Sequence, residues 1–114
     1  MDWLTISGED QLKEAHARSF EAPHHGVLLF KHSGRCSISI AAKGRLERKW
    51  DPAILDIPAY FIDVLGSREI SNKIAEQYGI EHQSPQALLI RDGKCTYTAS
   101  HSGISLEEIR DSLK

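Results

Sequence analysis

Apolar residues recur along the chain with two spacings, and each spacing predicts a different kind of element. Positions 12, 15, 16, 19 and 20 lie at helical intervals, so we predict a helix over about 8–20. A continuous apolar run at 27–30 and a mostly apolar segment at 59–65 are typical of short strands, and we expect the first to be buried on both faces. The pattern over 3–6 is also consistent with a strand at the start of the chain.

Three more helices are expected between and after these runs. The segment 37–49 predicts a helix, and its inward-facing residues are expected to be Ile40, Ala41 and Leu46. An apolar stripe at positions 70, 74, 75 and 78 predicts another helix, which ends at Gly79, where a left-handed residue belongs. Ser105 can cap a last helix, in which positions 106, 109 and 113 face the core.

Two strands before the last helix are predicted to form a hairpin. The runs 86–91 and 94–99 are joined by Asp92-Gly93, a pair that strongly favours a tight hairpin turn. Helices that alternate with strands in this order indicate an α/β fold, with a central mixed β-sheet flanked by helices. The chain of 114 residues shows no repeat or linker, so we expect one domain over 1–114.

Composition and charge exclude several classes of function. The formal net charge is −2, with 14 Lys and Arg against 16 Asp and Glu, which argues against a nucleic-acid partner. The longest apolar run is far shorter than the roughly 20 residues that cross a membrane. The N-terminal residues show no secretion signal, and two widely spaced cysteines are typical of free thiols in a reducing compartment. We therefore expect a cytoplasmic protein.

Cys36 is the leading candidate for chemistry because of its position. It follows the predicted strand 27–30 and a polar turn over 31–36, and it begins a helix. The first-turn N–H groups and the helix dipole stabilise a negative charge there, so the thiol is expected to ionise readily. Arg35 is adjacent, and Lys31 and His32 lie nearby in sequence, which suggests a positive local field. The alternative is an inert, half-buried cysteine that packs as a small apolar residue.

The residues around Cys36 indicate a single working thiol. The motif Cys36-Ser37-Ile38-Ser39 places a hydroxyl where a dithiol enzyme carries its resolving cysteine. If Cys36 reacts, it should therefore form a mixed disulfide that an external thiol releases. Ser39 could equally be a helix-surface residue. Cys95 could be a resolving thiol, but a spare sheet cysteine away from the active turn is the favoured interpretation.

Other polar residues give less specific signals. Ser84-Pro85 could form a cis peptide, although a trans turn is the more frequent case. His101 follows the last predicted strand and could approach Cys36 or cap the next turn. The six histidines show no metal-ligand spacing, so we expect no metal site and no bound cofactor.

Taken together, three motifs resemble the YtxJ-type monothiol bacilliredoxin family, within the thioredoxin-like superfamily. They are Lys31-His32-Ser33-Gly34-Arg35-Cys36-Ser37-Ile38-Ser39, Ser84-Pro85-Gln86 and Ser100-His101-Ser102, and the resemblance covers the chain from Trp3 to the last helix. It implies a thioredoxin-like fold and an enzyme that removes bacillithiol from modified protein cysteines. The expected partners are S-thiolated client proteins and the small thiol bacillithiol as co-substrate, with no nucleic acid and no membrane.

The resemblance also implies roles for individual residues. Cys36 would attack the protein–bacillithiol disulfide, while Ser84 and Pro85 would shape the substrate groove. The supporting positions are Ser33, Gly34, Arg35, Ser39 and His101. The family usually has Thr before the Arg and Pro after the Cys, where this chain has Gly34 and Ser37. Two alternatives stay open: a non-catalytic binding module, and an iron–sulfur scaffold resembling monothiol glutaredoxins.

Overall fold

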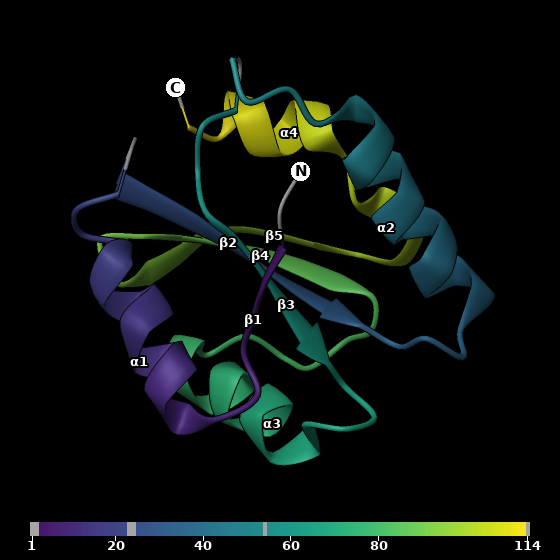
Figure 1. Cartoon of the computed structure of the whole chain (residues 1–114), viewed down its shortest axis with the longest axis horizontal. Helices are drawn as coiled ribbons and strands as arrows, with labels where there is room; N and C mark the ends of the chain where they lie inside the picture. The colour runs from purple at the N-terminus through teal and green to yellow at the C-terminus, as the bar shows by residue number, and fades with distance from the viewer. Residues whose placement is uncertain (1–2, 23–24, 54, 114) are drawn as a thin grey trace.

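The computed structural model describes residues 3–22, 25–53 and 55–113, and its elements form a five-stranded sheet covered by helices on both faces (Figure 1). The strands are β1 (Trp3–Thr5), β2 (Gly26–His32), β3 (Ala59–Asp63), β4 (Gln86–Arg91) and β5 (Lys94–Ser100). The helices are α1 (Glu9–Arg18), α2 (Ser37–Lys49), α3 (Arg68–Tyr78) and α4 (Leu106–Asp111), with a short 3₁₀ turn η2 (His101–Gly103) before α4.

The strand order is β1-β3-β2-β4-β5, which makes the sheet mixed. β3 pairs in parallel with both β1 and β2, whereas β4 pairs antiparallel with β2 and β5. This confirms the predicted α/β sheet, including the strand at the N-terminus. β2 lies at the centre, and all seven of its residues are buried.

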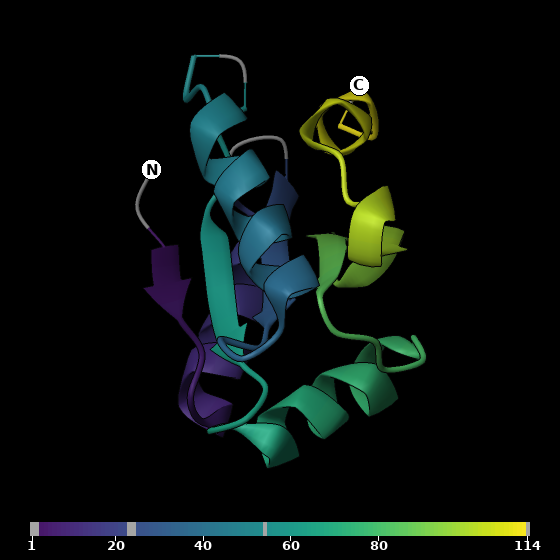
Figure 2. The same cartoon turned by 90° about the vertical axis from the view of Figure 1, so that its right-hand side faces the viewer.

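The two faces of β2 supply two separate cores because successive side chains of a strand point to opposite faces. Val27 and Leu29 pack with α1 and α3, whereas Leu28 and Phe30 pack with α2 and α4. Figure 2 shows α2 and α4 on the same side of the sheet, away from α1 and α3. Within the described ranges, no helix is long and apolar enough to cross a membrane.

Several predicted boundaries are confirmed, and one predicted helix face is wrong. α2 spans the predicted residues, and Gly79 ends α3 with a φ of 66°. In α2, however, Ser39, Ala42 and Leu46 face the core. Ile40 is 54% exposed, and Ala41 is exposed as well. The apolar pattern was misleading because a small polar residue, Ser39, takes an interior position.

The β4–β5 turn has the geometry that its sequence predicts and also contacts α1. Asp92 and Gly93 both have positive φ, at 50° and 77°, as a tight hairpin turn requires. The N–H groups of both residues donate to Ser19, one to its carbonyl and one to its hydroxyl, each at 3.0 Å. The turn therefore anchors the end of α1 to the sheet.

We predict that Gly93→Ala lowers the free energy of unfolding by about 1–2 kcal/mol, the cost of left-handed backbone for a residue with a Cβ. The added Cβ would also lie 2.6 Å from the Phe20 ring, which is half exposed and can move. Urea denaturation measures the effect. Gly103→Ala is the control, since its Cβ meets nothing within 4 Å. Equal stability of the two variants would contradict the prediction.

Candidate functional site

The sheet register brings the three sequence motifs to one end of the sheet. Lys31 of β2 pairs with Gln86 of β4, and Gln86 pairs with Ser100 of β5. Pro85 and His101 therefore lie beside the end of β2, where the chain continues to Cys36. Pro85 and His101, which follow Cys36 by 49 and 65 positions in the sequence, thus lie at the same end of the sheet as Cys36.

Cys36 is the N-cap residue of α2, as its sequence position predicts. Its N–H donates to the Ser33 carbonyl at 3.2 Å, and its own carbonyl accepts from the Ile40 N–H at 3.0 Å. The first turn of α2 holds no acidic residue. Cys36 is a free cysteine, and the residue is half-buried.

Ser39 is not a surface residue but the centre of a buried hydrogen-bond chain. The Ser33 N–H donates to Ser39 Oγ at 3.0 Å, and Ser39 Oγ lies 2.6 Å from His32 Nδ1. A serine hydroxyl has one donor and two acceptor sites, so this contact serves either tautomer of the neutral ring, and the hydroxyl donates to the imidazole when Nδ1 carries no proton. Burial, and secondarily the Lys43 ammonium, lower the pKa of His32 and favour that neutral form.

His32 and Lys31 were expected in a polar turn, and this prediction is wrong. β2 continues through both residues, and both side chains are buried. The His32 ring packs against both Phe30 and Phe61, with centroids 6.0 and 5.3 Å away. Three residues were expected to make the surroundings of Cys36 positive, and of these only Arg35 is exposed on the surface of the turn.

Lys31 instead holds the segment that precedes Pro85. Its fully buried ammonium donates to the Ser71 carbonyl at 3.0 Å and to His82 Nδ1 at 3.1 Å. Its strand neighbour Gln86 donates to the Glu81 carbonyl at 3.0 Å. Burial lowers the pKa of Lys31 to about 8. These two side chains fix residues 81–85 against β2 and α3.

The Ser84–Pro85 peptide bond is cis, so the frequency argument for a trans bond was misleading. Pro85 is buried, and its carbonyl accepts from the His101 N–H at 3.0 Å. His101 Nε2 lies 3.2 Å from Gln83 Oε1, which places this histidine beside the same segment. Ser84 Oγ is buried and has no hydrogen-bond partner among the described residues.

Cys95 lies at the opposite end of the sheet. It pairs with Ile90, which pairs with Val27 at the start of β2. His32 lies five residues after Val27 along the strand, a span of about 16 Å, so Cys95 cannot reach Cys36 within the chain. Burial raises the pKa of its thiol, which contacts the Tyr97 carbonyl at 3.4 Å.

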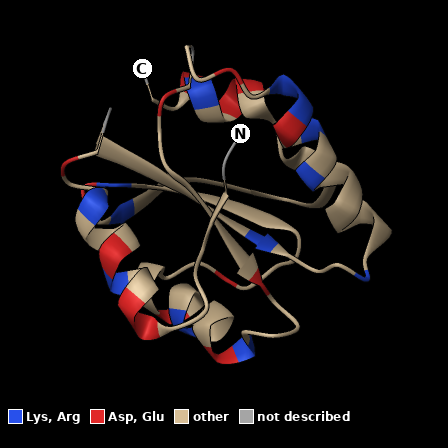
Figure 3. Ribbon diagram, in the orientation of Figure 1, with Lys and Arg blue, Asp and Glu red and all other residues tan. Residues whose placement is uncertain are grey.

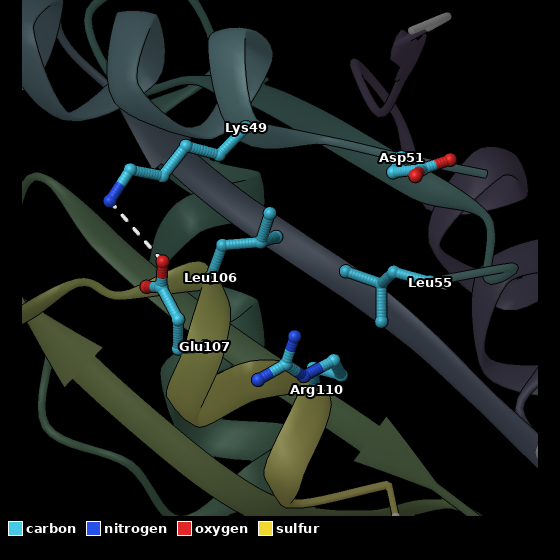
Figure 4. Close-up of a pocket in the computed structure, with 6 residues that line it drawn as sticks. All are labelled: Lys49, Asp51, Leu55, Leu106, Glu107 and Arg110. Atoms are coloured by element: carbon cyan, nitrogen blue, oxygen red, sulfur yellow. Dashed lines mark hydrogen bonds and ion pairs between the residues drawn. The ribbon is translucent and has the colours of Figure 1, made fainter. Parts of the chain in front are cut away.

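A separate hollow lies at the far end of α2 and contains none of the predicted residues. It measures about 330 Å³ and lies between α2 and α4, with Leu55 and Leu106 facing each other across it (Figure 4). No three His, Cys, Asp or Glu side chains gather as a metal site anywhere in the described parts of the chain. The expectation of no bound metal stays a prediction.

We predict that Ser39→Ala lowers the free energy of unfolding by about 1–3 kcal/mol, because it leaves the part-buried Ser33 N–H and the buried His32 Nδ1 without their partner. Ser37→Ala, at an exposed position of the same turn, should stay within about 0.5 kcal/mol of the wild type. Chemical denaturation of both variants provides the comparison. A neutral effect at Ser39 would contradict the assigned hydrogen-bond chain.

The buried ammonium of Lys31 predicts an unusual dependence of stability on pH. A lysine has a pKa near 10.4 when unfolded, so between about pH 8 and 10 the unfolded state binds more protons than the folded state. The free energy of unfolding of the wild type should therefore rise with pH relative to that of Lys31→Met. We expect a relative gain of about 1–2 kcal/mol between pH 8 and 9.5. A constant difference would show that Lys31 titrates normally.

Comparison with known proteins agrees with this geometry. The family described as monothiol bacilliredoxin BrxC matches residues 4–109. A solved thioredoxin-fold protein superposes with a TM-score of 0.82 at 23% identity, covering 97% of this chain and 93% of its own. Thioredoxin from Malassezia sympodialis superposes with a TM-score of 0.73 at 15% identity, covering 98% of this chain and 88% of its own. Thioredoxin from Fasciola hepatica superposes with a TM-score of 0.71 at 14% identity, covering 96% of this chain and 95% of its own. The structures establish a thioredoxin fold, and the family match shows that the chain belongs to the monothiol bacilliredoxin family.

Proposed function

We propose that this protein removes bacillithiol from S-bacillithiolated proteins through a mixed disulfide at Cys36. Its family and fold support a thiol oxidoreductase. The observation that carries the finer proposal is the presence of one half-buried thiol at the N-terminus of α2, next to the cis-Pro85 segment. No second thiol of the same chain can reach it.

The proposed reaction is a thiol–disulfide exchange. The Cys36 thiolate attacks the bacillithiol sulfur of the client disulfide, forms a new S–S bond and breaks the old one. The client cysteine leaves as a thiolate and takes a proton from solvent. A second bacillithiol thiolate then attacks the mixed disulfide, which releases Cys36 and yields the bacillithiol disulfide. Each step exchanges one disulfide for another, so no further oxidant or reductant is needed.

The surroundings of Cys36 support this monothiol route. In dithiol enzymes the second thiol attacks the mixed disulfide and closes an internal bond. Here Ser39 occupies that position, and its hydroxyl is held by Ser33 and His32. A hydroxyl cannot form a disulfide, so the adduct on Cys36 must wait for an external thiol.

The proposal extends to partners and location. The co-substrate is bacillithiol, the clients are S-thiolated proteins, and the protein itself holds no cofactor. A cycle that depends on a free small thiol needs a compartment where thiols are kept reduced, so we place the reaction in the cytoplasm. Ser84 and Pro85 are proposed to align the extended client backbone, as in the related fold.

We predict that Cys36→Ser abolishes the release of bacillithiol from a bacillithiolated model protein, whereas Cys95→Ser leaves the rate unchanged. The first variant loses the only thiol at this end of the sheet, and the second loses a thiol at the other end. Mass spectrometry of the client over time provides the measurement. Retained activity in the Cys36 variant would overturn the proposal, and a colour developed on anaerobic iron–sulfur reconstitution would favour a cluster scaffold instead.

A further inference from the structure

The segment that follows β2 carries an excess of positive charge that the rest of the chain lacks. Residues 35–49 contain five Lys and Arg against one Glu, although the whole chain has a net charge of −2. The remaining residues therefore carry a net charge of −6. Figure 3 shows that the Lys and Arg gather on the C-terminal half of α2, while its N-terminal half is uncharged.

Among the residues that the structure describes, three of these five cations have no acidic partner. Lys43 pairs with Glu47 at 2.8 Å, and Lys49 pairs with Glu107 at 3.2 Å, as Figure 4 shows for the second pair. For Arg35, Arg45 and Arg48, no ion pair forms with any residue that the structure describes. Nη2 of Arg45 is also buried without a hydrogen-bond partner.

The free charges continue an apolar stripe that begins beside Cys36. Ile38, Ala41, Arg45 and Arg48 follow the spacing i, i+3, i+7 and i+10, which places them along one side of a helix. Ile38 is 50% exposed. Arg45 borders a small hollow of about 150 Å³ together with Ile104, so this side of α2 faces the chain between η2 and α4.

We propose that this stripe is the docking surface for client proteins, and that it selects clients with acidic residues near the modified cysteine. The inference rests on the function proposed above. An apolar side chain next to the client cysteine would contact Ile38, and the acidic residues would pair with Arg45 and Arg48. Arg35 offers a further positive charge directly beside Cys36.

The spacing of the stripe sets where the acidic residues should lie. At 1.5 Å per helical residue, Arg45 lies about 14 Å and Arg48 about 18 Å along the axis from Cys36. An extended client covers these lengths in about four to six residues. Because the rest of the surface is net negative, an acidic client is attracted here and repelled elsewhere, which orients its approach.

The test uses three synthetic peptides that each carry one bacillithiolated cysteine. They share an apolar neighbour and differ only at the fourth to sixth positions from the cysteine, which are all Glu, all Gln or all Lys. For the wild type at low salt we expect kcat/KM to be about tenfold higher for the Glu peptide than for the Lys peptide. Near 0.5 M salt, where surface charges are screened, we expect this ratio to fall to about twofold or less.

Two variants with the same net charge distinguish an effect of the stripe from an effect of the overall charge of the protein. Arg45→Gln/Arg48→Glu should bring the Glu-to-Lys ratio close to one. Lys13→Gln/Lys94→Glu makes the same change in net charge on other elements, at exposed positions, and should keep the wild-type ratio. With bacillithiol as the reductant, both variants should catalyse the reduction of the small uncharged bis(hydroxyethyl) disulfide at the wild-type rate.

The outcomes distinguish the two proposals. Equal kcat/KM for all three peptides, with normal turnover, would overturn the docking surface and leave the proposed function standing. No adduct on Cys36 with any peptide would overturn both. Equal loss of preference in the two variants would assign the effect to net charge and not to the stripe. A further control measures the binding of a single-stranded oligonucleotide. If the wild type binds it tightly and Arg45→Gln/Arg48→Glu does not, the stripe is a nucleic-acid-binding surface, and the proposal of a client surface is overturned.

Discussion

The hydrogen bond between Ser39 and His32 determines how the reactive end of this molecule is built. It joins the last residue of the central strand to the first turn of α2, inside the core and beside Phe30 and Phe61. Through the Ser33 N–H it also holds the turn in between. A buried polar chain of this kind is stabilising only when every member is satisfied, so the geometry of the turn is strongly specified. The contact thus helps to hold the turn that carries Cys36, together with the backbone hydrogen bonds of Cys36 to Ser33 and Ile40.

The same contact explains why one thiol acts alone. The position that would carry a resolving cysteine is used to organise the turn, and the second cysteine of the chain lies at the far end of the sheet. On the other side of β2, Lys31 and Gln86 fix the segment before the cis-proline with hydrogen bonds to Ser71, His82 and Glu81. Two polar clusters, one on each face of the central strand, thus position the cysteine and the opposing loop independently.

Local patterns in the sequence were enough to predict most of the fold but not these clusters. The bounds of α2, the Asp92-Gly93 hairpin and the left-handed Gly79 follow from spacing and turn chemistry, which act over a few residues. The burial of Lys31 and His32 depends on partners up to 51 positions away, and no periodicity reveals those. Ser39 turns inward because its hydroxyl contacts this buried His32, and the apolar Ile40 and Ala41 therefore lie at the surface. The position of Cys36 was predictable because a helix N-terminus is a local feature, whereas the cis peptide at Pro85 was not.

The most direct test of the monothiol account is the intact mass of the protein, trapped by acid during turnover of a bacillithiolated client. The account predicts a single adduct, one bacillithiol on Cys36, with the client released as a free thiol and no internal disulfide. Parallel incubation with a glutathionylated client shows whether the small thiol itself is selected. A protein that stays unmodified with both clients, or an internal Cys36–Cys95 disulfide, would contradict the account.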